Sequence, residues 1–208
     1  MIAQAGGADR VEICKDKSTD GITPLFETVE ALRDKLNIEL NVMIRPRAGL
    51  YVYSDDEFEQ IKRDVIRFKE LKVDGLVFGV LDESNQLHIP RNKELIELAY
   101  PLPCTFHRAF DVVKDVYRSL EDCIHCGFTT ILTSAQQKSA MEGIDTLIKL
   151  VQQANNRIII MPGGGVRSTN VLALKNNLGM PYYHSSAITD GGEIADLNEI
   201  RLLKAVLS

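Results

Sequence analysis

Short β-rich runs that end in Gly, Pro or polar residues recur along the whole chain, and an amphipathic helix-like segment follows each one. Such alternation with short connections is typical of βα units that build a parallel sheet. No linker or break in composition divides the 208 residues, so we expect one domain over 1–208. The predicted strands are Arg10–Cys14, Glu39–Ile44, Gly75–Val80, Pro103–His107, Thr129–Thr133, Arg157–Met161 and Tyr182–Ser185.

Helix-like segments lie between these strands, and two of them carry a clear start signal. Thr23 followed by Pro24 fits a cap with Pro at the first helical position, and Ser54 with Glu57 fits a capping box. The predicted helices are Pro24–Leu36, Ser54–Leu71, Asn92–Ala99, Asp115–Cys126, Ala140–Asn155, Ser168–Leu178 and Asp196–Leu207.

Seven predicted strands and a final helix favour an α/β fold of the TIM-like (β/α) barrel type over an open doubly wound sheet. A closed barrel of this type has eight strands. The chain opens directly on helix-like residues 1–9, so the strand that should precede them, strand one, is absent. Our hypothesis is that the given sequence begins after strand one, which mapping of the translation start upstream of Met1 would test.

Composition and charge exclude several classes of protein. The net charge is −5 with Lys and Arg scattered, whereas a nucleic-acid surface would show a basic patch. No apolar run is long enough to span a bilayer, and the first residues lack the pattern of a signal peptide. Four cysteines in a chain of this length do not make a disulfide scaffold. We therefore expect a cytoplasmic protein with reduced thiols and no membrane or nucleic-acid partner.

The run from Arg157 to Val166 combines a buried strand with three consecutive glycines, Gly163, Gly164 and Gly165. Glycines at the carboxyl end of a strand allow positive φ and let a ligand approach the backbone closely. The helix start that follows offers free N–H groups to an anion. This pattern predicts a binding site for phosphate or another small anion, and the alternative is a glycine-rich turn with no ligand.

Nearly every predicted strand delivers polar side chains at its carboxyl end, where the active site of a parallel barrel is built. These residues are Glu12, Cys14, Arg45, Arg47, His107, Arg108, Asp111, Ser134, His184 and Ser185. Arg45 and Arg47 flank a proline bend, which suits binding of a carboxylate or phosphate. The alternative for these two arginines is a structural salt bridge to Asp or Glu.

Alternation along the strands separates the side chains by face. Glu12 and His107 would point into the barrel mouth, whereas Val11 and Phe106 would face the helices. Glu12 and His107, with Asp111 nearby, form a candidate acid/base set. The alternatives are that Glu12 pairs with a barrel arginine and that His107 is a core histidine.

The cysteines differ in what they could bind. Cys123 and Cys126 have metal-like C-x-x-C spacing, but Cys123 lies on the apolar stripe of a helix and no second ligand pair accompanies it, so we predict core residues. Cys14 is the thiol best placed to reach the mouth. With Met161 nearby, it could hold a soft ion such as Cu(I).

Several segments in order along the chain together resemble the CutC family, described as copper homeostasis proteins. The resemblance implies a TIM-like barrel, a cytoplasmic location, a homo-oligomer (often a dimer) and Cu(I) binding. Ala48 and Ala135 stand where the family commonly has glycine. The matching segments are Gly7–Cys14, Thr23-Pro24, Val42–Arg47, Tyr53-Ser54, Asp74–Gly79, Thr105–Asp111, Ile131–Ser134, Met161–Val166 and His184–Ala187.

The sequence therefore predicts two alternative functions. The first is copper homeostasis with Cys14 as a Cu(I) ligand. The second is an enzyme acting on a small anionic metabolite, with Glu12 or His107 as acid/base, Arg45 and Arg47 as clamps, and the glycine loop as the phosphate seat. A scaffold without chemistry is a third reading, which the many polar strand ends disfavour.

Overall fold

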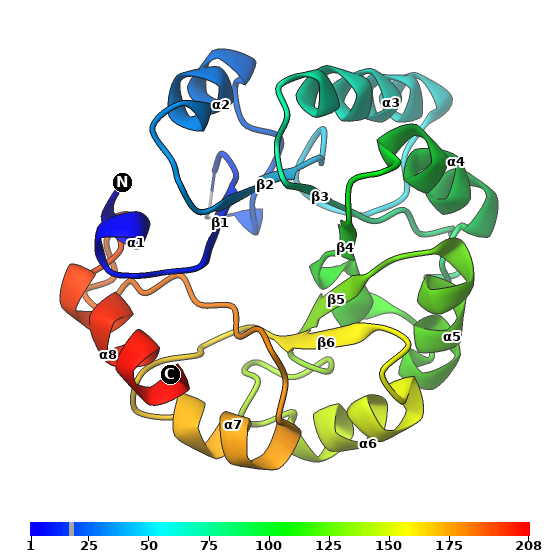
Figure 1. Cartoon of the computed structure of the whole chain (residues 1–208). Helices are drawn as coiled ribbons and strands as arrows, with labels where there is room; N and C mark the ends of the chain where they lie inside the picture. The colour runs from blue at the N-terminus through cyan, green and yellow to red at the C-terminus, as the bar shows by residue number, and fades with distance from the viewer. Residues whose placement is uncertain (17–18) are drawn as a thin grey trace.

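Six parallel strands curl into an incomplete barrel with the helices on its outside (Figure 1). The computed structural model describes residues 1–16 and 19–208. The strands pair in sequence order, which confirms the predicted TIM-like fold class. They are β1 (Arg10–Ile13), β2 (Glu39–Met43), β3 (Gly75–Phe78), β4 (Cys104–Phe106), β5 (Thr130–Thr133) and β6 (Ile159–Pro162).

The helices follow the amphipathic pattern of the sequence. In α3, Phe58, Ile61, Val65 and Phe68 are buried at helical spacing, and Ser54 and Glu57 form the predicted capping box. The elements outside the sheet are α1 (Ile2–Ala5), α2 (Phe26–Arg33), α3 (Asp55–Glu70), α4 (Ile89–Ala99), the 3-10 helix η2 (Arg108–Val112), α5 (Val116–Cys126), α6 (Ile144–Ala154), α7 (Val171–Leu178) and α8 (Leu197–Leu207).

The predicted strand Tyr182–Ser185 does not form, so the sheet has six strands rather than seven. One backbone hydrogen bond, from His184 N to Pro162 O at 2.9 Å, still holds this segment beside β6. No strand in the described part of the chain pairs with its other side. A strand is maintained by a ladder of hydrogen bonds, and a single bond does not make one.

The sheet is open between β1 and residues 182–185, and helices α1 and α8 lie side by side at this opening (Figure 1). Helix α1 packs on α8, where Lys204 Nζ lies 2.6 Å from Asp9 Oδ1. The guanidinium of Arg10 stacks over the ring of Tyr182 at 4.2 Å. The contacts given across this opening are therefore between helices and between side chains rather than a strand pairing.

The main core lies between the sheet and the helices. Phe106 is fully buried there, and its ring packs against Phe128 at a centroid distance of 5.1 Å. Phe106 thus faces the helices, as its place in the strand alternation predicted. Cys123 and Cys126 also belong to this core, where burial raises the pKa of the Cys126 thiol to about 11. These two cysteines are packing residues, as predicted.

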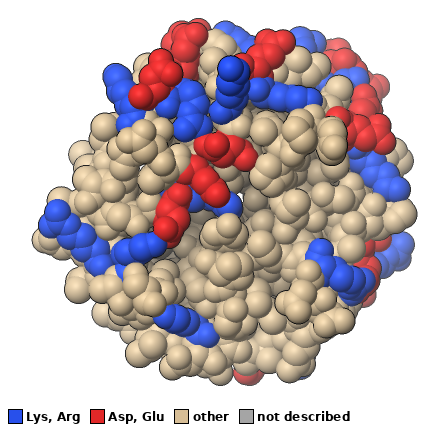
Figure 2. Space-filling view, in the orientation of Figure 1, with Lys and Arg blue, Asp and Glu red and all other residues tan. Residues whose placement is uncertain are grey.

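The surface seen in Figure 2 carries acidic and basic side chains interspersed, with no continuous basic patch on that face. Its lower part, over β6, α6 and α7, is largely uncharged. None of the helices in the described residues has both the length and the apolar character needed to cross a membrane.

Candidate functional site

The carboxyl ends of the strands surround a pocket of about 250 Å³ at the mouth of the barrel. This volume suits a small metabolite, since drug-sized ligands occupy cavities of roughly 300–1,000 Å³. Of the residues predicted from sequence, the pocket lining includes Glu12, Cys14, Arg45, His107, Arg108, Gly164, Gly165, His184 and Ser185. Four predicted residues lie outside this lining, namely Arg47, Asp111, Ser134 and Gly163.

Arg45 holds two loops together at the pocket wall. Its side chain is buried, with Nη1 donating to the carbonyls of Thr19 and Gly21 and Nη2 donating to that of Gly49. Its Nε lies buried without a hydrogen-bond partner. Most of its donors are therefore used by the backbone, and Nε is the donor that remains for a ligand.

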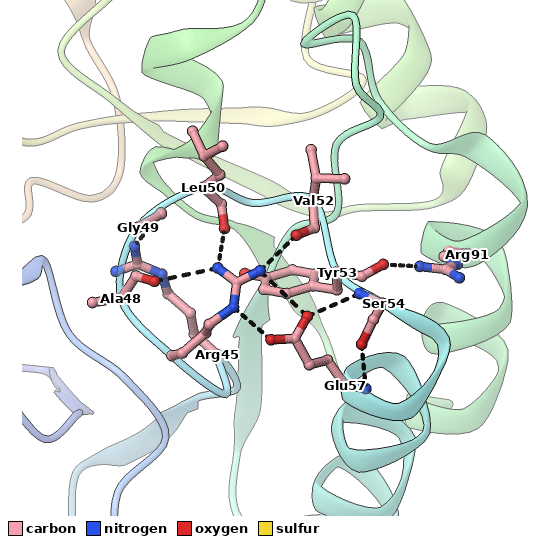
Figure 3. Close-up of polar contacts among 10 residues, drawn as sticks. Arg45, Ala48, Gly49, Leu50, Val52, Tyr53, Ser54, Glu57 and Arg91 are labelled. Carbon is pink, nitrogen blue, oxygen red and sulfur yellow. Dashed lines mark hydrogen bonds and ion pairs between the residues drawn. The ribbon is translucent and has the colours of Figure 1, made fainter.

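Arg47 lies outside the pocket lining, in the loop between β2 and α3. Figure 3 shows this loop, with Leu50, Val52 and Glu57 labelled. Its guanidinium donates to Glu57 and to the carbonyls of Leu50 and Val52. The hydrogen bond from Arg47 also lowers the pKa of Glu57. The structure thus contains the structural salt bridge that the sequence left open as the alternative for Arg47, and it does not bring this residue into the pocket lining.

His107 is a neutral hydrogen-bond donor at the floor of the pocket. Burial, followed by the positive charge of Arg45, lowers its pKa to about 3. Its Nδ1 accepts from the backbone N–H of Ala109 at 3.3 Å, and this bond assigns the proton to Nε2. A histidine with so low a pKa is a poor general base near neutral pH, so its chemical role is donation from Nε2.

The buried state of His107 predicts a pH dependence of stability. Below pH about 6.5 the unfolded chain binds a proton that the folded chain rejects. The free energy of unfolding should therefore fall as the pH drops from about 6.5 toward 3, by up to about 1.4 kcal/mol per pH unit from this group. Chemical denaturation at pH 7 and pH 5 measures the effect, and His107→Gln should weaken it. His125→Gln, at an exposed histidine, should leave this pH dependence unchanged. If the free energy of unfolding fell by the same amount between pH 7 and pH 5 in both variants, His107 would not be the source of the effect.

Asp111 supports the site from behind its lining. Its Oδ1 accepts from the backbone N–H groups of Ser134 at 3.0 Å and Gln136 at 3.1 Å, and Thr133 Oγ1 donates to the same oxygen. Its Oδ2 accepts from Arg108 Nε at 2.7 Å. Asp111 therefore holds Arg108 and the loop after β5 in place from outside the pocket lining, and its predicted part in acid/base chemistry stays a prediction.

Arg108 presents its guanidinium to the pocket. Asp111 holds its Nε, and its Nη2 donates to Ser134 Oγ at 2.9 Å. A Cβ built on Gly164 would lie 3.7 Å from Arg108 Nη2 and 3.3 Å from Ser134 Cβ. Ser134 therefore orients Arg108 rather than contacting the pocket, and Arg108 lies beside the glycine loop.

The glycine loop after β6 has the backbone shape of an anion cradle. Gly164 and Gly165 have φ values of 92° and 67°, in the left-handed region that favours glycine. Consecutive N–H groups in such turns form concave sites for anions. Gly163 instead packs against Leu132, because a Cβ added to this glycine would lie 2.4 Å from Leu132 Cδ1. Two of the three predicted glycines thus face the pocket.

Arg167 lines the same wall and was missed from sequence. Its guanidinium donates to the carbonyls of Val166 and Ile188 and to the hydroxyls of Ser185 and Ser186. Its place two residues after Gly165 was the available signal. Arg167 joins the glycine loop to the loop that carries His184 and Ser185.

Cys14 also lines the pocket at the mouth, where it is exposed at the surface. A Cβ built on Gly21 would lie 3.0 Å from Cys14 Sγ and 3.7 Å from Met43 Cε. The thioether in the pocket lining is thus Met43, not Met161 as predicted. Among the described residues, no three His, Cys, Asp or Glu side chains cluster as metal ligands. Glu12 lines the pocket too, and within the same residues it forms no ion pair with Arg45 or Arg47.

Comparison with known proteins assigns the chain to a family. The family model described as CutC family matches residues 1–189. The chain belongs to the CutC family. A Xanthomonas campestris protein named as a CutC family protein is 46% identical over 90% of this chain and 78% of its own length. The human copper homeostasis protein cutC homolog is 40% identical over 89% of this chain and 68% of its own length.

Solved structures agree with this membership. CutC from Streptococcus agalactiae matches with a TM-score of 0.83 and 35% identity, over 88% of this chain and 90% of that one. Phosphoribosyl anthranilate isomerase from Thermotoga maritima matches with a TM-score of 0.64 over 99% of this chain, at 13% identity. The second likeness shows a shared barrel fold only.

Proposed function

We propose that this member of the CutC family binds a small anionic metabolite at the barrel mouth and acts on it as an enzyme. The observation that supports this most is the balance of charge in the pocket lining. The lining contains three arginines, Arg45, Arg108 and Arg167, and two acidic residues, Glu12 and Asp20, so positive charge exceeds negative charge. The backbone cradle at Gly164 and Gly165 adds N–H donors beside Arg108.

The roles of the residues follow from their surroundings. Arg108 and the glycine loop bind the phosphate or carboxylate of the metabolite. Glu12 is the acid/base, because it is half-buried in the pocket lining and is not tied to an arginine of the pocket. His107 donates a hydrogen bond from Nε2 to an oxygen of the ligand. This arrangement fits a proton transfer on a small oxygen-rich substrate.

Titration calorimetry with inorganic phosphate tests the binding site. Arg108→Gln should weaken phosphate binding by about 10- to 100-fold, because a hydrogen bond to a charged group contributes about 1.5–3 kcal/mol. Arg118→Gln is the matched control, since Arg118 lies exposed on α5, away from the pocket. Equal affinity in the two variants, or no phosphate binding by the unaltered protein, would contradict the proposal.

Cu(I) binding is the second candidate function, supported by the names of the relatives and by sulfur in the pocket. Cys14 and Met43 both line it, close to Gly21. Thiolate and thioether are the soft ligands that Cu(I) prefers. Copper would here be cargo bound at the mouth, with Cys14 as the principal ligand.

Cys14→Ala should abolish tight one-to-one Cu(I) binding by the reduced protein, because it removes the thiolate. Competition with a chromophoric Cu(I) chelator measures the affinity. Cys104→Ala is the control, since Cys104 is buried in β4 and burial raises the pKa of its thiol to about 12. Retained tight binding in Cys14→Ala would rule out Cys14 as the ligand.

The resemblance extends the proposal to cellular context. The protein would act in the cytoplasm as a homodimer or higher homo-oligomer, with residues 1–208 as one folding domain. Sedimentation velocity would give the oligomeric state, and a single cooperative unfolding transition would support one domain.

A further inference from the structure

Two buried donors at the floor of the pocket have no acceptor. They are Arg45 Nε and His107 Nε2, on residues that are 3% and 2% exposed. Both residues line the pocket at the barrel mouth. A buried N–H that lacks an acceptor costs about 1–3 kcal/mol, so such groups are rare away from binding sites.

The ring of Tyr51 packs on both donors. Its centroid lies 4.9 Å from that of His107 and 4.7 Å from the guanidinium carbon of Arg45. An aromatic face is a weaker acceptor than a carboxylate oxygen. The backbone of Tyr51 is fixed, because its carbonyl accepts from Leu81 N at 2.9 Å. A ligand would reach the two donors if the half-buried ring turned aside by side-chain rotation, a motion that would leave this backbone hydrogen bond in place.

A third buried polar atom lies near Arg45. The Tyr53 hydroxyl is also buried without a well-formed hydrogen bond, and burial raises its pKa to about 12, so it keeps its proton. The positive charge of Arg45 opposes this rise, which places the two groups near each other. A side-chain hydrogen bond with Arg45 also opposes the rise in the pKa of Tyr53, and a protonated hydroxyl can accept as well as donate. The two nitrogens, Arg45 Nε and His107 Nε2, are therefore the donors that matter here.

We propose that Arg45 Nε and His107 Nε2 form an inner subsite for the carboxylate of the substrate, and that the ring of Tyr51 covers this subsite. One guanidinium and one neutral imidazole carry a single positive charge, which matches one carboxylate. A guanidinium and an N–H donor side by side suit the two oxygens of a carboxylate.

The inner subsite narrows the class of substrate. It rests on the proposed function, because Arg108 and the glycine loop would bind the other end of the same molecule. The substrate class is then a small carboxylic acid that also carries a phosphate group. The pocket volume of about 250 Å³ is consistent with a compact molecule of this kind.

Calorimetry with 2-phosphoglycolate and methyl phosphate tests the inner subsite, because the two probes differ in the carboxylate. We expect 2-phosphoglycolate to bind at least tenfold more tightly to the unaltered protein. His107→Phe should abolish this preference, because it should weaken 2-phosphoglycolate binding at least tenfold more than it weakens methyl phosphate binding. His107→Gln, whose amide restores an N–H donor, should retain part of the preference. A preference equally large in His107→Phe would overturn the role of His107.

Dihydroxyacetone phosphate separates a carboxylate from a carbonyl as the inner group. Binding as tight as that of 2-phosphoglycolate would overturn the assignment of a carboxylate. Equal affinities for 2-phosphoglycolate and methyl phosphate would overturn the inner subsite alone, whereas no binding of either probe would also overturn the proposed function. Nitrogen-15 NMR of the unaltered protein serves if a variant does not fold: the His107 Nε2 resonance should shift with 2-phosphoglycolate and stay in place with methyl phosphate.

Discussion

Asp111→Ala is expected to lower the free energy of unfolding by about 3–5 kcal/mol, as loss of one partner from a buried charged network does. The carboxylate accepts from the N–H groups of Ser134 and Gln136, from the hydroxyl of Thr133, and from Arg108. Its side chain is only 9% exposed, so water cannot fully replace these bonds. Chemical denaturation with a circular dichroism readout gives the free energy.

Asp115→Asn is the matched control for the change at Asp111. Asp115 caps α5 by accepting from the N–H groups of Tyr117 and Arg118. Asparagine caps a helix about as well as aspartate, so stability should change by less than about 0.5 kcal/mol. If Asp111→Ala were as mild as this control, Asp111 would not hold the loop after β5 in place.

Gly143→Ala is expected to destabilise the protein by about 3 kcal/mol, at the upper end of the usual cost of overpacking. A Cβ at this buried position would lie 2.1 Å from the carbonyl oxygen of Ser134. This atom belongs to the backbone of the loop after β5, so it cannot rotate away as a side chain would. The start of α6 and the loop that orients Arg108 would have to move apart. Thermal and chemical denaturation measure the loss.

Gly179→Ala separates steric overlap from backbone conformation. Gly179 has a φ of 58° and ends α7, where an added Cβ meets nothing within 4 Å. The cost there is conformational only, about 1–2 kcal/mol. A loss in Gly143→Ala no larger than in Gly179→Ala would show that the loop after β5 yields easily.

The fold was largely predictable because periodicity and capping are local signals. Ser54 and Glu57 marked the start of α3, and six of the seven predicted strands form. Residues 182–185 were an exception, since β pairing depends on neighbours that a local pattern does not reveal. At position 135 the CutC family commonly has glycine, and this chain has alanine. Ala135 has a φ of 55°, a left-handed conformation that glycine adopts freely, so the backbone conformation there is one that glycine suits.

The site was predictable in outline but not in detail. Strand alternation placed Phe106 against the helices and His107 at the pocket correctly. The direction of Arg47 depended on Glu57, ten residues further on, and on loop carbonyls that no sequence pattern identifies. The low pKa of His107 results from burial and from Arg45, which are properties of the folded chain.

Backbone NMR during a phosphate titration would show whether an anion binds at the barrel mouth. We expect saturable shifts of the amide resonances of Gly164 and Gly165, with smaller changes on the far side of the barrel. The dissociation constant from these shifts should agree with the calorimetric value and should rise in Arg108→Gln. Amides of Gly164 and Gly165 that stay unmoved at saturating phosphate would contradict the account.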